Sequence, residues 1–167
     1  MISFELKENI HESDFYTFET SWIGEEIYDI DKNTVSIPIL NLEVQNKEVL
    51  KLLKFDSYNS VYVRESYFNF TGVYKVEKKL RIQQNKKFVA KVNEDFEFEN
   101  INPEQRTFEL GGMGVYNENF YDGIFKIYAS ECLLVVNENS HISIDFISMD
   151  CYNPIEDSWL KNFFKAV

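Results

Sequence analysis

The side chains best suited to metal binding or nucleophilic catalysis are few in this chain. The histidines are His11 and His141, and the cysteines are Cys132 and Cys151. No Cys-x-x-Cys or His-x-x-x-His spacing occurs, so a zinc site would need ligands scattered along the sequence. A Cys–His nucleophilic pair would require one of the cysteines to meet a histidine. Because Cys132 stands among apolar residues, we expect it to be a small buried side chain.

Carboxylates are abundant and outnumber the basic side chains, with 28 Asp and Glu against 17 Lys and Arg. A glycosidase-like pair of acid and base stays open as an alternative, although chance pairs are expected in so acidic a chain. The run Gly111–Gly114 is followed by neither a helix signal nor a Lys-Ser or Lys-Thr pair. We therefore expect a glycine turn or bulge there rather than a phosphate-binding loop. These observations predict no cofactor, no metal and no enzymatic activity.

The net charge of −11 is distributed in blocks along the chain. Residues 1–31 hold nine carboxylates against Lys7, and residues 94–122 hold eight against Arg106. Between them, residues 75–91 hold seven Lys or Arg against Glu77. So acidic a chain would repel the phosphates of nucleic acid and would suit a basic protein partner. The basic block has a simpler explanation, because lysines on an edge strand prevent edge-to-edge pairing. Solvated faces are the simplest explanation of all three blocks.

The acidic segment 95–99 carries the main functional hypothesis. In an extended strand Asp95, Glu97 and Glu99 project to one side, and Phe96 and Phe98 to the other. Like charges on one face are tolerated when that face is wet, and they become useful when it meets cations. We expect these three carboxylates to contact a partner. A second expected set lies in the earlier acidic turn and comprises Glu25, Glu26, Asp29 and Asp31.

The fold class follows from apolar alternation and composition. Aromatic residues make up 16% of the chain while glycine and proline are scarce, which favours sheets over loops. The central feature is a predicted hairpin of two long strands, 124–136 and 141–149, joined by a polar connector. We predict a mainly β (α+β) fold, either a strongly bent antiparallel sheet or a sandwich. At 167 residues the chain is expected to form a single domain, residues 1–167.

Two helices are predicted. Residues 46–54 place Val49, Leu50, Leu52 and Leu53 at helical spacing, with Asn46 as N-cap. Residues 154–166 follow a second cap at Asn153 and carry an apolar stripe that should dock on the sheet.

The N-terminus shows no basic region followed by an apolar run, and no stretch approaches the length of a membrane span. These features predict a cytoplasmic protein that binds neither membrane nor nucleic acid. In size, acidity and lack of active-site motifs the chain resembles bacterial immunity proteins, including those of contact-dependent growth inhibition. The resemblance implies an inhibitor that binds and neutralises a cationic toxin domain of the nuclease type.

Two other classes of function stay open. One is a carbohydrate- or ligand-binding β domain that uses Trp22, Tyr116 or Tyr121 as a platform, although we expect these aromatic rings to form the core. The other is an enzyme with a site assembled from scattered carboxylates. A deep aromatic cleft would favour the first, and convergent carboxylates in a concave pocket would favour the second.

Overall fold

The structure, a computed structural model, describes most of the chain up to Ile142. The described residues are 1–6, 22–23, 26–40, 42–44, 47–59, 61–63, 66–85, 87–99, 106–116, 119–137 and 141–142. The predicted C-terminal helix 154–166 and residues 143–149 of the predicted hairpin lie outside them. The described part is mainly β, with one short helix, as the composition predicted.

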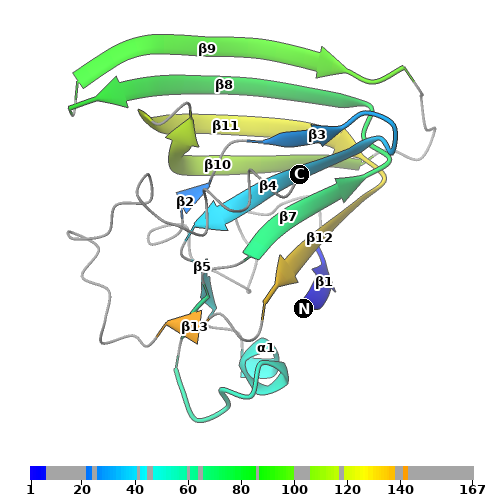
Figure 1. Ribbon diagram of the computed structural model, residues 1–167, viewed down its shortest axis with the longest axis vertical. Helices are drawn as coiled ribbons and strands as arrows, with labels where there is room; N and C mark the ends of the chain where they lie inside the picture. The colour runs from blue at the N-terminus through cyan, green and yellow to red at the C-terminus, as the bar shows by residue number, and fades with distance from the viewer. Residues whose placement is uncertain are drawn as a thin grey trace.

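A ten-stranded sheet makes up most of the described structure (Figure 1). Its order is β1-β12-β7-β4-β2-β10-β11-β8-β9, and β3 pairs with β4 beside this path. All its pairings are antiparallel except the parallel contact between β2 and β10. The strands are β1 (Ile2–Glu5), β2 (Trp22–Ile23), β3 (Ile27–Asp29), β4 (Thr34–Leu40), β7 (Ser66–Thr71), β8 (Lys75–Gln84), β9 (Lys87–Glu97), β10 (Arg106–Tyr116), β11 (Asn119–Ala129) and β12 (Glu131–Val136).

A small second sheet and the helix lie at the other end of the molecule (Figure 1). The sheet has the order β13-β6-β5, formed by β13 (His141–Ile142), β6 (Val61–Val63) and β5 (Leu42–Val44). The helix α1 (Lys47–Leu52) confirms the helix predicted over 46–54. Val49 and Leu50 are buried, whereas Leu52 is 59% exposed, so α1 packs through only part of its predicted apolar face.

The sheet is strongly bent, because a two-stranded ribbon passes through a corner. Strands β8 and β11 pair on one side of the corner, and β7 and β12, their continuations along the chain, pair on the other. Two backbone hydrogen bonds hold the corner: Ser130 donates to Thr71 at 3.0 Å, and Tyr74 donates to the carbonyl of Tyr128 at 3.0 Å. Gly72, at φ 59°, supplies the left-handed turn in one of the two strands. This geometry confirms the predicted bent antiparallel sheet.

The predicted central hairpin is wrong. The expected strand 124–136 is divided at Ser130 into β11 and β12, which four other strands separate in the order of the sheet. Both edges of β12 are occupied, by β1 and by β7, while His141 and Ile142 pair with β6. Apolar alternation continues through the corner, so the sequence pattern resembles that of one long strand.

The core lies on the inner face of the bend, where alternate residues of β4, β7, β8, β11 and β12 are buried. In β7 Ser66, Phe68 and Phe70 are buried while the residues between them are partly exposed. Phe70 meets Phe108 of β10 with ring centroids 5.6 Å apart. Side chains from several strands complete this core, among them Val35, Ile37, Ile39, Leu110, Phe125, Ile127 and Leu134.

The glycine run 111–114 is neither a turn nor a bulge, contrary to the sequence-based expectation. It continues β10 without interruption and pairs residue for residue with β11, Gly112 lying opposite Gly123. On the other side of β11, a Cβ built on Gly123 would lie 2.3 Å from the carbonyl oxygen of Lys79. At Gly123, therefore, the glycine permits a close approach of β8 and β11.

Candidate protein-binding surface

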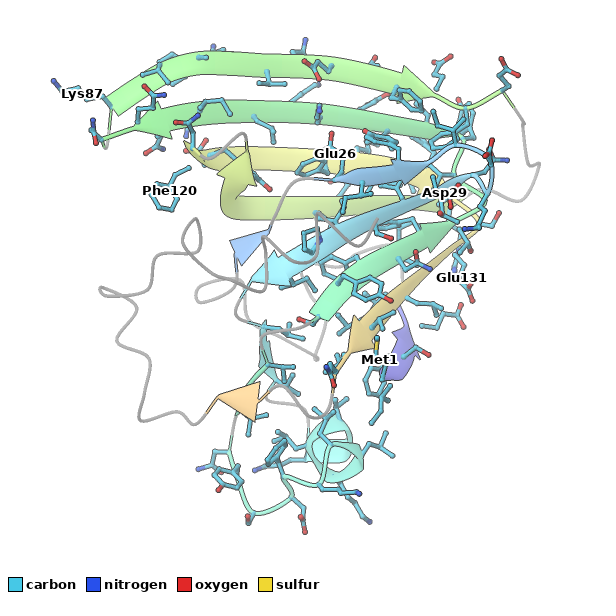
Figure 2. All side chains as sticks on the ribbon, viewed as in Figure 1. Met1, Glu26, Asp29, Lys87, Phe120 and Glu131 are labelled. Atoms are coloured by element: carbon cyan, nitrogen blue, oxygen red, sulfur yellow. The ribbon has the colours of Figure 1, made fainter. Side chains whose placement is uncertain are left out.

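Two acidic segments that lie far apart in the sequence meet at one end of the ten-stranded sheet. One is the β3–β4 turn with Asp29 and Asp31, and the other is the end of β9 with Asp95, Glu97 and Glu99 (Figure 2, where Asp29 is labelled). The segment between β7 and β8 joins them. Its Val73 donates to the carbonyl of Asn33 at 2.9 Å, and Phe98 donates to the carbonyl of Tyr74 at 2.7 Å. We call these five carboxylates the acidic end.

The β3–β4 turn is held by its own side chains. Lys32 donates to Asp29 through its backbone N–H at 3.2 Å and through its ammonium at 2.7 Å. Asn33 adopts a left-handed φ of 52°, which asparagine tolerates and which closes the turn. The hydrogen bond from the Lys32 ammonium lowers the pKa of Asp29 below its ordinary value, so Asp29 stays ionised. Asp31 is exposed on the same turn.

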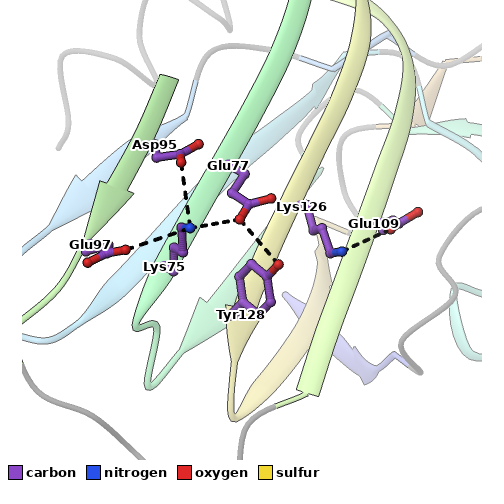
Figure 3. Close-up of polar contacts among 7 residues, drawn as sticks. All are labelled: Lys75, Glu77, Asp95, Glu97, Glu109, Lys126 and Tyr128. Carbon is purple, nitrogen blue, oxygen red and sulfur yellow. Dashed lines mark hydrogen bonds and ion pairs between the residues drawn. The ribbon is translucent and has the colours of Figure 1, made fainter. Parts of the chain in front are cut away.

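One lysine, Lys75, forms ion pairs with three carboxylates on the outer face of β8 and β9 (Figure 3). The ammonium of Lys75 lies 2.9 Å from Glu77, 3.6 Å from Asp95 and 3.7 Å from Glu97. The hydrogen bond with Glu77 raises the pKa of Lys75 and lowers the pKa of Glu77. Tyr128 also donates to Glu77 at 3.3 Å.

The Lys75 cluster neutralises the acidic end only in part. Lys75 is 18% exposed, whereas Asp95 and Glu97 are 58% and 66% exposed and turn most of their surface to water. Glu99 is exposed as well. Lys75 and Lys32 together form ion pairs with Glu77, Asp95, Glu97 and Asp29, so the carboxylates at this end of the sheet outnumber the lysines that contact them. Part of the basic block that we expected to protect a strand edge thus forms ion pairs with the acidic segment.

Glu26 does not belong to this surface. It is buried, and its carboxylate is engaged by the ammonium of Lys78, which also lies 3.0 Å from Glu94. The second oxygen of Glu26, Oε2, accepts no hydrogen bond from any residue the structure describes. Its expected role as an exposed contact residue is therefore wrong. β3 packs against the inner face of the sheet, where Tyr28 meets Phe96, and Glu26, the residue just before β3, is buried there with Lys78. Glu25 lies outside the described residues.

A shallow cavity of about 280 Å³ adjoins this buried pair, and its lining is mixed in character. The residues that line it are Tyr28, Val76, Lys78, Glu94, Asp95 and Phe96. The rings of Tyr28 and Phe96 lie 4.7 Å apart and close one side. Among the described residues no three His, Cys, Asp or Glu side chains are placed to hold a metal ion.

The remaining candidates for chemistry are core residues wherever the structure describes them. Cys132 is fully buried, and burial raises the pKa of its thiol well above the ordinary value, so it is a poor nucleophile. Tyr121 is 2% exposed with its ring 6.0 Å from Phe125, which makes it part of the core and not a platform for a ligand. The side chains of Trp22 and Tyr116 lie outside the described set.

The sequence did not predict one feature, the long exposed edge formed by β9. The basic block and the acidic segment 95–99 were treated as separate features, but β9 runs without a break from Lys87 to Glu97. It pairs with β8 alone among the described strands, and every residue except Val92 is exposed. The signal was present as an alternation of apolar and polar residues from Ala90 to Glu97, interrupted only at Glu94 and obscured by the change from basic to acidic residues.

The outer face also carries a bidentate ion pair between Arg81 and Asp122 that gives a test of pH dependence, and Gln83 donates to the same carboxylate at 3.3 Å. Arg81 donates to Asp122 from Nε at 2.6 Å and from Nη2 at 2.7 Å. These bonds lower the pKa of Asp122 below its ordinary value of 3.8. The pair therefore contributes stability above that value, and the contribution is lost as the pH falls through the lowered pKa.

We expect Asp122→Asn to lower the free energy of unfolding at neutral pH by up to about 1 kcal/mol, because Arg81 is well exposed and water screens the pair. The difference from the native chain should vanish in strong acid, as urea titrations over a pH series would detect. Asp56→Asn, in an exposed loop after α1, is the control. A difference that persisted at the lowest pH would contradict the assignment.

Comparisons with models of protein families, with curated proteins and with solved structures found no match to this chain.

Proposed function

We propose that this protein binds a cationic protein and blocks it, as the immunity protein of a bacterial toxin does. The observation that carries the proposal is the meeting of two acidic segments at one end of the sheet, where carboxylates outnumber the lysines that contact them. A basic partner such as a nuclease domain, whose own cleft must attract phosphates, is complementary to such a surface.

The arrangement of the acidic end suits rapid association more than tight anchoring. Asp95 and Glu97 are well exposed, and exposed charges act over distance to steer an approaching partner. Their contacts with Lys75, at 3.6 and 3.7 Å, are long, so both carboxylates stay available to a partner. Affinity would then come from an adjoining apolar group such as Ile30, which is 64% exposed on the β3–β4 turn.

The test uses a variant that reverses charge without removing the contacts of Lys75. In Asp31→Lys/Glu99→Lys the two changes lie on the two segments that the fold brings together. Immunity proteins are often encoded beside their toxin, so the product of the adjacent gene is the partner to test. We expect its association, measured by stopped flow at low ionic strength, to slow by about tenfold or more, because steering depends on charge. The difference should shrink as salt is added.

A matched control has the same net charge but leaves the acidic end intact. Glu5→Lys/Asp56→Lys reverses two exposed carboxylates elsewhere on the described surface. If both double variants slowed association equally, net charge and not the acidic end would be responsible. The proposed function would be wrong if the product of the adjacent gene did not bind this protein and if co-expression of this protein did not protect cells from that product.

A further inference from the structure

Strand β9 is a long edge of the sheet in the part of the chain that the structure describes. It has eleven residues, pairs with β8 alone among the described strands, and forms the upper border of the sheet in Figure 1. Edge strands of soluble proteins are commonly short, interrupted or covered, because a free row of N–H and C=O groups pairs with other chains. Here the edge is long, and it exposes Phe88 by 56%, Val89 by 49% and Phe96 by 37%.

The stretch Ala90–Glu97 is regular, because the one irregularity of the β8–β9 ladder lies before it, at Ile82/Gln83. Its faces follow from its partners in β8. Ala90, Val92 and Phe96 lie opposite the buried Ile82, Leu80 and Val76, and so belong to the inner face together with Glu94. The outer face then carries Lys91, Asn93, Asp95 and Glu97.

The outer face is self-complementary. Lys91 precedes Asn93 by two residues and Asp95 follows it by two. A two-fold axis at Asn93 therefore relates the position of Lys91 in one copy to the position of Asp95 in the other. In an antiparallel pairing about that axis, Lys91 of each copy lies directly opposite Asp95 of the other. On the inner face the same register places the half-exposed ring of Phe96 opposite the small side chain of Ala90. An axis at Lys91 would instead oppose two lysines, which is unfavourable.

Both charged groups are available for this pairing. Lys91 is exposed and forms no ion pair in the part of the chain that the structure describes. Asp95 is 58% exposed, and Lys75 lies 3.6 Å from it but only 2.9 Å from its nearer partner, Glu77. We propose that a second copy of this chain pairs with β9, antiparallel about Asn93, and makes one continuous sheet across a two-fold dimer. This inference depends on β9 and not on the proposed function.

Reversing the charges of Lys91 and Asp95 tests the register, because a substitution in a two-fold dimer changes both symmetry-related contacts. Sedimentation equilibrium of the full chain should give a mass that approaches twice 19.8 kDa as the concentration rises. Lys91→Glu and Asp95→Lys should each weaken dimerisation by about tenfold, since both opposed pairs become repulsive. The combined variant Lys91→Glu/Asp95→Lys should regain most of the native affinity. Lys79→Glu, on the same face but one strand in from the edge, is the control for net charge.

Hydrogen exchange locates the contact. The β9 amides that point away from β8 should be protected at high protein concentration and should exchange faster on dilution. A native chain that stays at the mass of one copy, or a double variant no better than its single parents, would overturn the proposal. So would a chain whose β9 amides gain protection only when the product of the adjacent gene is added, which would assign the edge to that partner.

Discussion

Replacing Gly123 with alanine should destabilise the protein by on the order of 3 kcal/mol, near the upper range for overpacking a core. The added Cβ would lie 2.3 Å from the carbonyl oxygen of Lys79 and 2.8 Å from the Cα of Leu80. Both atoms belong to the backbone of β8, so no side-chain rotation relieves the contact. β8 is itself paired with β9 on its other side, and a shift of β8 would therefore disturb two ladders.

Urea unfolding monitored by tryptophan fluorescence or circular dichroism measures this effect. Ile124→Ala is the matched control, since Ile124 is the next residue of β11, is 48% exposed and points to the opposite face. The control should cost no more than about 0.5 kcal/mol, as at other exposed sites. A Gly123→Ala variant as stable as the native chain would contradict the close approach of β8 and β11 at this position.

The sequence predicts the class of the fold because class depends on local pattern. Ser66–Thr71 alternates buried and half-exposed side chains as a strand with one covered face must, and the structure confirms this for β7. The helix near residue 50 was also predictable, because Val49, Leu50 and Leu53 lie on one face within two turns. Neither inference requires knowledge of distant partners.

Topology was not predictable in the same way. The break at Ser130 is a corner that depends on two hydrogen bonds to the segment around residues 71–74, some sixty residues earlier. Nothing in the neighbours of Ser130 marks it, because a serine between apolar runs also suits the outer position of an unbroken strand. The run Gly111–Gly114 misled for a similar reason, since glycine in a strand is needed only where another backbone approaches, as β8 approaches Gly123.

The candidate surface was partly predictable. Alternation alone places Asp95 and Glu97 on one face, and the structure confirms their exposure. Their shared contact with Lys75 follows from the register of the β8–β9 hairpin, in which Glu97 lies opposite Lys75. Their approach to the β3–β4 turn depends on how the sheet bends, which no local pattern encodes. The burial of Glu26 was not predictable for the same reason, because it follows from the packing of β3 on the inner face of the sheet and not from the residues beside Glu26 in the sequence.

That burial leads to the second large effect. Lys78 and Glu26 form an ion pair with side chains only 9% and 2% exposed. Neutralising the lysine in Lys78→Met keeps most of the side chain's volume and leaves a buried carboxylate without its cation. Removing one partner of such a pair costs about 3–5 kcal/mol, because the remaining charge has lost both its compensation and its water. Glu94 is 59% exposed and can turn to solvent, so the loss falls on Glu26.

The cause is tested through a second substitution, made at the partner Glu26. Adding Glu26→Gln should recover part of the loss at neutral pH, because the uncompensated charge is then gone. Lys79→Met, the adjacent and exposed lysine, should change the free energy of unfolding by no more than about 0.5 kcal/mol. A loss in Lys78→Met that Glu26→Gln did not reduce would mean that packing, and not the charge of Glu26, makes Lys78 necessary.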